Sequence, residues 1–173
     1  MNRRRLIASS FALAGAGAAG KALADIPARS LSLLNLHTGE KLSATYWEGG
    51  AYVSDALQAL NHLLRDFRTG ESHTMAPQLL DLVNLLGRKL ETRQTVQIIS
   101  GYRSPQTNAA LHERSSGVAT RSLHMQGQAM DIRIPGVELS RVRDAALDMK
   151  LGGVGYYPGS DFVHVDIGRV RRW

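Results

Sequence analysis

The stretch from Pro77 to Leu90 carries more apolar side chains than one face of a helix can hold, and it constrains the fold more than any other feature. Proline suits the first position of a helix, because the first N–H groups of a helix have no partner within it. A helix that is apolar on so many sides must be covered by other elements. We therefore expect a largely buried helix whose leucines and valine belong to the core and not to a cofactor site: Leu79, Leu80, Leu82, Val83, Leu85, Leu86 and Leu90.

Strand and helix patterns alternate on both sides of this segment. Residues 29–36 and 41–47 alternate apolar and polar side chains around a turn, which predicts a β-hairpin. An amphipathic helix follows, with Ser54 as its candidate cap and Gly70 beyond its end. Further along we expect strands at 95–100, 128–134, 153–157 and 162–167, and helices from Ser104-Pro105 to about Arg114 and from about Ser140 to Met149. Early helices and late short strands indicate an α+β fold, with helices packed on a small, mainly antiparallel sheet.

Residues 1–24 form a segment of a different kind. An arginine run precedes an apolar stretch from Leu6 to about Ala19 and a small-residue exit at 22–24. This order is typical of a secretory signal peptide, and the stretch is too short to span a bilayer stably. The paired arginines resemble a twin-arginine export signal, with an ordinary signal as the alternative. We expect export to the periplasm or cell envelope, no stable membrane insertion, and a single monomeric domain over residues 25–173.

Most of the formal net charge of +6 belongs to that first segment. Without residues 1–24, four of the 21 basic residues are lost and 17 remain against 15 acidic ones, a net charge of +2. So small an excess gives little support for nucleic-acid binding. The chain has no cysteine, which excludes disulfides, thiolate ligands and a cysteine nucleophile. Any metal must be held by His, Asp or Glu, as in a zinc site built from nitrogen and oxygen.

Two of the six histidines stand near an aspartate on a predicted strand. In FVHVDI, the two-residue period of a strand puts His164 and Asp166 on one face. In SLHMQGQAMDIRI, Gly127 allows the loop to fold back and bring His124 beside Asp131. Neighbouring strands could thus offer His124, Asp131 and His164 to one ion. Three protein ligands with an open fourth position are typical of a catalytic zinc, and a hydrogen-bonded polar cluster is the alternative.

Four segments, closed by a terminal Trp173, carry a resemblance to a known family: NLHTGE, ISGYRS, SLHMQGQAMDI and GGVGYYPGSDFVHVDIG. They resemble the M15 zinc peptidases, which have the D-alanyl-D-alanine peptidase and hedgehog type of fold, and most closely the murein endopeptidase K group. The similarity spans essentially the whole chain after the predicted signal. The combination of SxHxxGxAxD with a later HxD is highly specific, whereas either motif alone would be weaker.

The resemblance implies that His124, Asp131 and His164 bind one Zn²⁺. It also implies that Arg103 holds the substrate and stabilises charge on the scissile carbonyl, a role that suits a planar guanidinium. A surface ion pair is the alternative for this arginine. The general base is expected at Asp161, three positions before the last histidine, or at Asp166, which is alternatively the partner that orients a ligand.

Three tyrosines at strand ends, Tyr102, Tyr156 and Tyr157, are candidates for lining a substrate groove, with packing as the alternative.

The resulting expectation is a zinc endopeptidase that hydrolyses the peptide cross-links of peptidoglycan, at D-alanyl-diaminopimelate or diaminopimelate-diaminopimelate bonds. One alternative is a carboxypeptidase or dipeptidase that trims stem peptides, and another is a zinc-bearing module that binds the wall without cutting it. Other hydrolase classes fit worse, because the patterns Ser-x-x-Lys, Gly-x-Ser-x-Gly and His-Glu-x-x-His are absent from the sequence.

Overall fold

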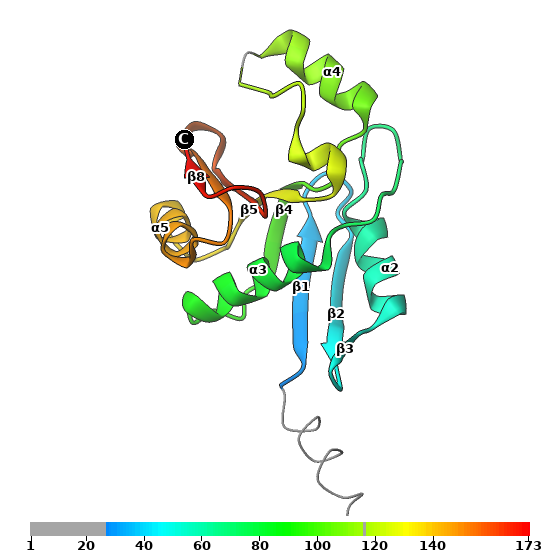
Figure 1. Ribbon diagram of the computed structural model, residues 1–173, viewed down its shortest axis with the longest axis vertical. Helices are drawn as coiled ribbons and strands as arrows, with labels where there is room; N and C mark the ends of the chain where they lie inside the picture. Colours follow the sequence, from blue (N-terminus) through cyan, green and yellow to red (C-terminus); the bar gives the residue numbers. More distant parts are fainter. Residues whose placement is uncertain (1–26, 116) are drawn as a thin grey trace, which may run out of the picture.

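A curved sheet of eight strands organises the part of the chain that the computed structural model describes, residues 27–115 and 117–173 (Figure 1). The segment predicted as a signal peptide, residues 1–24, lies outside these ranges. The elements in chain order are β1 (Arg29–Asn35), β2 (Lys41–Glu48), β3 (Ala51–Tyr52), α2 (Ser54–Leu63), α3 (Pro77–Lys89), β4 (Val96–Ser100), α4 (Pro105–Arg114), the 3₁₀ turn η1 (Leu123–Gln126), β5 (Ala129–Arg133), α5 (Leu139–Met149), β6 (Gly153–Tyr157), the 3₁₀ turn η2 (Pro158–Ser160), β7 (Phe162–Asp166) and β8 (Arg171–Arg172).

The strands follow the order β3-β2-β1-β4-β5-β7-β6-β8. Neighbouring strands are antiparallel except in two pairs, β1 with β4 and β6 with β8. The prediction of an α+β fold with a mainly antiparallel sheet is therefore confirmed, but the sheet is wider than expected. Its edge strands β3 and β8 have two residues each, too few to leave a strand pattern in the sequence.

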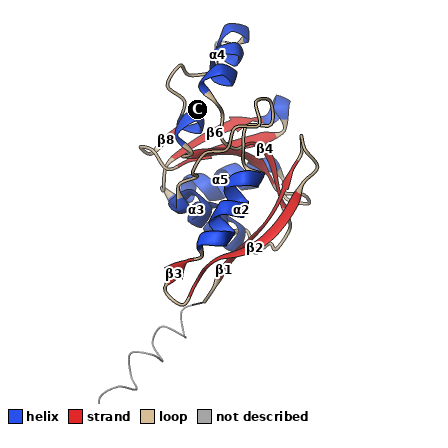
Figure 2. Ribbon diagram, turned by 90° about the vertical axis from the view of Figure 1, so that its right-hand side faces the viewer, coloured by secondary structure: helices blue, strands red, loops and turns tan. Residues whose placement is uncertain are grey.

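Helices α2, α3 and α5 gather against one side of the sheet, whereas α4 stands apart from that layer (Figure 2). Helix α3 lies against β1 and α5, and it buries Leu79, Leu80, Leu82, Val83 and Leu86. The expectation that it is covered on nearly every side is wrong for Leu85, which is 43% exposed, because α3 leaves one face to solvent. No helix within the described ranges is long and apolar enough to cross a membrane.

The ends of two helices depend on hydrogen bonds to backbone N–H groups. Ser104 caps α4 as expected, since its side chain accepts a hydrogen bond from the N–H of Thr107 at 3.2 Å. The expected cap at Ser54 is wrong, because Ser54 is already helical and Val53 takes the cap position. Helix α2 also ends earlier than its pattern predicts. Just beyond it, the buried Asp66 accepts hydrogen bonds from the backbone N–H groups of Arg68 and Ser104, and so ties this turn to the start of α4.

One carboxylate joins α3 to the first three strands of the sheet. Asp81 accepts hydrogen bonds from Arg29 on β1 at 2.8 Å, Tyr46 on β2 at 2.9 Å and Tyr52 on β3 at 2.7 Å. Burial opposes its ionisation, but hydrogen bonds from Tyr52, Arg29 and Tyr46 outweigh burial and lower the pKa of Asp81. Burial of Tyr46 and its hydrogen bond to Asp81 raise the pKa of the tyrosine hydroxyl.

We predict that Asp81→Ala lowers the free energy of unfolding by about 1–3 kcal/mol, because it leaves the hydroxyl of the fully buried Tyr46 without its acceptor. Because the pKa is lower in the folded state, the carboxylate's contribution is complete above its ordinary pKa of about 3.9 and is lost as the pH falls through the folded-state value. Urea unfolding at neutral and acid pH measures both effects. Asp148→Ala, at an exposed side chain 3.6 Å from Lys89, is the control, and an equal loss of stability there would contradict the prediction.

Candidate metal centre

Strand pairing at the centre of the sheet places two of the expected ligands side by side. β5 and β7 are antiparallel neighbours, and Asp131 stands directly opposite His164 in their register. Residues opposite each other in such a pair point their side chains to the same face. Both residues are buried, at 6% and 8% exposure. The sheet thus fixes an aspartate and a histidine beside each other with no contribution from a loop.

The third expected ligand, His124, comes from η1, which leads into β5 through Gly127. Gly127 adopts the left-handed conformation, with φ of 66°, which a residue with a Cβ enters at a cost. A Cβ here would also collide with the carbonyl oxygen of Thr74, while the N–H of Ala76 donates to the Gly127 carbonyl at 2.9 Å. The loop therefore folds back tightly at this glycine, as the sequence predicts, and it brings His124 over the strands.

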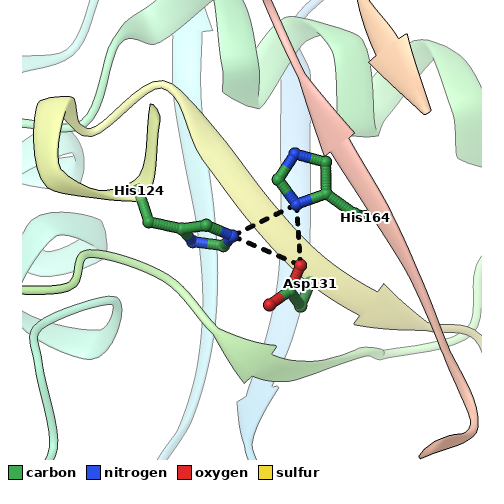
Figure 3. A group of neighbouring side chains, drawn as sticks. All are labelled: His124, Asp131 and His164. Carbon is green, nitrogen blue, oxygen red and sulfur yellow. Dashed lines mark hydrogen bonds and ion pairs between the residues drawn. The ribbon is translucent and has the colours of Figure 1, made fainter. Parts of the chain in front are cut away.

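One donor atom from each of the three residues converges on a common point (Figure 3). His124 Nε2 lies 3.2 Å from His164 Nδ1 and 3.3 Å from Asp131 Oδ1, and His164 Nδ1 lies 2.9 Å from Asp131 Oδ1. Donors about 2.0–2.1 Å from an ion at tetrahedral angles lie about 3.3 Å apart. The spacing of these atoms therefore fits one tetrahedral metal ion with its fourth position open.

The outer nitrogen of each imidazole has its own partner, which leaves the inner nitrogen free to bind. His124 Nδ1 donates to the carbonyl of Gly101 at 2.7 Å, and His164 Nε2 donates to Asp166 Oδ2 at 3.0 Å. A hydrogen bond of this kind fixes the tautomer and the orientation of a metal-binding histidine. The lone pairs of both rings consequently face Asp131.

Asp166 lies behind His164 and is fully buried. Its Oδ1 accepts from the N–H groups of Gly153 and Gly168 and from Arg171 Nη1, and its Oδ2 accepts from His164 Nε2 and Arg171 Nη2. Burial opposes ionisation, but these hydrogen bonds outweigh it and hold the pKa of Asp166 well below its ordinary range. With both oxygens committed, Asp166 is a partner that orients His164.

Arg103 stands on the other side of Asp131, with Nη2 3.6 Å from Asp131 Oδ2 and only 11% of its side chain exposed. Burial lowers the pKa of Arg103, although Asp131 opposes that effect. Its Nε is buried with no hydrogen-bond partner among the residues described. Burial also acts against the charge of Asp131, but His124 and His164 outweigh it and lower the pKa of that carboxyl. The Arg103 guanidinium therefore lies beside the candidate centre, and its Nε–H has no acceptor among the residues described.

The centre opens into a pocket of about 480 Å³ with two unlike sides. Arg103 lines it together with Arg121 and neighbouring residues of the loop after α4. Aromatic residues from the C-terminal strands line it too, namely Tyr157, Phe162 and Trp173. The sequence gives no sign that Phe162 and Arg171 line the pocket, because a lone phenylalanine and a C-terminal arginine carry no motif of their own.

Two of the three candidate tyrosines, Tyr102 and Tyr156, do not line this pocket. Tyr102 stacks on His73 with ring centres 4.7 Å apart, and Tyr156 lies against the core with the guanidinium of Arg143 over its ring at 4.6 Å. The third candidate, Tyr157, does line the pocket, since successive side chains of β6 point to opposite faces.

Asp161 is at the rim of the pocket and not in it. It follows η2 with φ of 54°, its side chain is 62% exposed, and it forms an ion pair with Arg133. Its chain neighbours Ser160 and Phe162 both line the pocket. The structure thus brings together His124, Asp131, His164, Asp166 and Arg103, and leaves Asp161 facing Arg133.

A buried His-Asp-His group under an open pocket is the arrangement of a hydrolytic metal centre. The family model Peptidase M15_2, described as peptidoglycan L,D-endopeptidase MepK, matches residues 24–173. The chain belongs to this M15 peptidase family, as its motifs predict, and to its murein endopeptidase K group.

Curated relatives cover nearly the whole chain. Peptidoglycan L,D-endopeptidase MepK of Escherichia coli K12 is 46% identical over 181 residues, which cover 99% of this chain and 97% of the relative, and the Shigella flexneri protein of the same name gives the same values. The probable peptidoglycan L,D-endopeptidase MepK of Haemophilus influenzae is 42% identical over 146 residues, 84% of this chain and 78% of the relative.

We predict that His124→Ala abolishes binding of one Zn²⁺ per chain at neutral pH, because two ligands cannot replace the converging set of three. Metal content after dialysis, measured by mass spectrometry, checks this. His62→Ala changes an exposed histidine on α2 and should leave one bound zinc. A His124→Ala protein that still binds zinc with the original affinity would contradict the assignment.

Proposed function

We propose that the protein is a metal-dependent endopeptidase that hydrolyses peptide cross-links of peptidoglycan. The observation that carries the proposal is the convergence of His124 Nε2, Asp131 Oδ1 and His164 Nδ1 under a pocket that also holds Arg103. The relatives named as peptidoglycan endopeptidases, at 46% identity over nearly the full chain, support the same activity.

The relatives' names specify L,D bonds, which favours one of the two expected cross-links. A diaminopimelate-diaminopimelate link joins an L-centre to a D-centre, whereas a D-alanyl-diaminopimelate link joins two D-centres. We therefore propose the first of these as the substrate. Action on the wall requires export, and residues 1–24, with their paired arginines, are proposed as the signal for it.

Zn²⁺ is the proposed ion, because two imidazoles and one carboxylate suit its preference for nitrogen and oxygen ligands in a tetrahedral site. Bound there, it would supply an open position for a water of lowered pKa and would polarise the scissile carbonyl. The protein contributes the orientation of the ligands, through Gly101 and Asp166.

Arg103 is proposed to bind the scissile carbonyl oxygen and to stabilise the negative charge that develops on it. Three features support this: the side chain lines the pocket, it is mostly shielded from water, and its Nε lacks a partner among the residues described. A donor held in place before the reaction needs no rearrangement when charge appears, which makes its stabilising effect large.

Asp161 is the proposed general base. Asp166 cannot turn toward the pocket, because it is fully buried and five hydrogen bonds hold its oxygens. Asp161 is exposed and lies between two pocket-lining residues, so its carboxylate can leave Arg133 and turn inward. Proton transfer by a positioned base typically contributes about 10²–10⁴-fold to the rate.

Substitutions of Asp161 and Asp166 should have different effects, one on turnover and the other on metal affinity. Asp161→Ala should lower kcat about 10²–10⁴-fold with full metal content, because only the base is removed. Asp166→Asn should weaken zinc binding about 10–100-fold, because its amide oxygen stays with the three donors of Oδ1 and the NH₂ group that replaces Oδ2 cannot accept from His164 Nε2. Steady-state kinetics and competitive zinc titration measure the two quantities. Unchanged turnover in Asp161→Ala would remove the base assignment.

The activity itself is tested on purified cross-linked muropeptides. The protein should convert diaminopimelate-linked dimers to monomers, the reaction should stop on chelation of the metal, and it should return when zinc is restored. Mass spectrometry of the fragments identifies the bond. Release of single amino acids from uncross-linked stems would indicate a carboxypeptidase, and a zinc-loaded protein that binds but cleaves neither substrate would indicate a binding module.

A further inference from the structure

The last residue of the chain is held in place by the sheet. Strand β8 pairs with β6 in parallel, and the pairing continues to Trp173, whose N–H donates to Val154 at 3.2 Å and whose carbonyl accepts from Tyr156 at 3.1 Å. Arg171 adds a second attachment through its two hydrogen bonds to Asp166. The C-terminal end is therefore anchored next to the candidate metal centre.

This anchoring lays the Trp173 side chain over β6 beside the centre. A Cβ at Gly155 would lie 2.7–2.8 Å from atoms of the indole ring, so the ring can pack here only because this residue has no side chain. Gly155 is paired with His164, and the Trp173 ring centre lies 5.1 Å from that imidazole. The indole Nε1 donates to the Tyr157 hydroxyl at 2.6 Å.

The ring is fixed on one side and open on the other. Arg171 covers it with a guanidinium 4.8 Å from the ring centre, yet 49% of Trp173 remains exposed and the residue lines the pocket. Tyr157 and Phe162, stacked at 4.5 Å, extend the aromatic surface. An aromatic surface held this rigidly can contact a ligand without first losing side-chain entropy.

The charged side chains that line the pocket indicate which charged group such a ligand carries. Arg103 is assigned to the scissile carbonyl, Asp131 belongs to the candidate metal centre and Arg171 is taken by Asp166, so the exposed Arg121 is the cation left for another group of the ligand. A ligand with an aliphatic chain and a free carboxylate matches the aromatic surface and Arg121 together. A diamino diacid residue in a peptide has both features.

We propose that Trp173 is a specificity-determining residue of the endopeptidase, and that its indole face packs against the methylene chain of the diamino diacid next to the scissile bond. The assignment rests on the proposed function for the identity of the substrate. It gives the C-terminal strand a role in substrate binding, with Arg171 and Gly155 as the residues that position the ring.

Kinetics of the zinc-loaded full chain on diaminopimelate-linked muropeptide dimers test the role. Trp173→Ala should raise KM about tenfold with kcat within about twofold, because a contact made equally with substrate and transition state affects binding alone. Trp173→Phe, which keeps an aromatic ring, should lie in between. Trp47→Phe, at the buried tryptophan of β2, should match the unchanged protein. Zinc affinity should stay the same in all three variants.

An unchanged KM in Trp173→Ala would overturn the proposal. A loss of zinc affinity with unchanged KM would do the same, because it would show that the ring only supports His164.

A binding measurement separates this proposal from the proposed function. The chain has two tryptophans, so Trp173 is the only tryptophan in Trp47→Phe and can be excited selectively over the tyrosines. Titration of the metal-chelated Trp47→Phe protein with the muropeptide dimer should shift Trp173 emission and saturate, and Trp173→Phe, which retains Trp47, should give no change. A shift without cleavage by any zinc-loaded protein would sustain the contact and refute the endopeptidase. Cleavage without a shift would leave the endopeptidase intact and refute the contact.

Discussion

The register between β5 and β7 is the constraint on which the rest of the site depends. Asp131 and His164 are opposite partners near the middle of an eight-stranded sheet, with β4 and β6 as the outer neighbours of the pair. A slip of one residue in either strand would turn its own ligand to the helix-covered face and bring a core residue, such as Met130 on β5 or Val165 on β7, to the pocket. Because that face is a packed core, the register is strongly specified, and the hydrophobic effect indirectly fixes the distance between two polar atoms.

The buried polar groups of the site form hydrogen bonds with residues that lie outside it. The outer nitrogens of His124 and His164 are satisfied by Gly101 and Asp166, and Asp166 is satisfied in turn by two backbone N–H groups and Arg171. Burying a polar group without a hydrogen-bond partner costs much more folding free energy than burying a paired one. Each residue in this chain of hydrogen bonds therefore restricts which residue can stand next to it. The C-terminal strand thereby becomes part of the framework around the candidate centre.

Local pattern predicted the elements and the convergent residues well. The strand period put His164 and Asp166 on one face, and Gly127 marked the fold-back that places His124, as the structure has them. What the sequence could not predict depends on distant contacts. The exposure of Leu85 follows from what α3 packs against, and the turn just beyond the early end of α2 is held by a hydrogen bond between Asp66 and Ser104, 38 residues apart. Trp173 joins the pocket through parallel pairing of a two-residue strand, for which no periodic signal exists.

A crystal structure of the full chain with zinc, with anomalous scattering recorded at the zinc edge, tests the central claim most directly. We expect one peak about 2.0–2.2 Å from His124 Nε2, His164 Nδ1 and a carboxylate oxygen of Asp131, with Asp166 still hydrogen-bonded to His164 Nε2. A zinc ion coordinated through His164 Nε2, or bound away from these three residues, would contradict it, because the outer hydrogen bonds would then no longer orient the ligands.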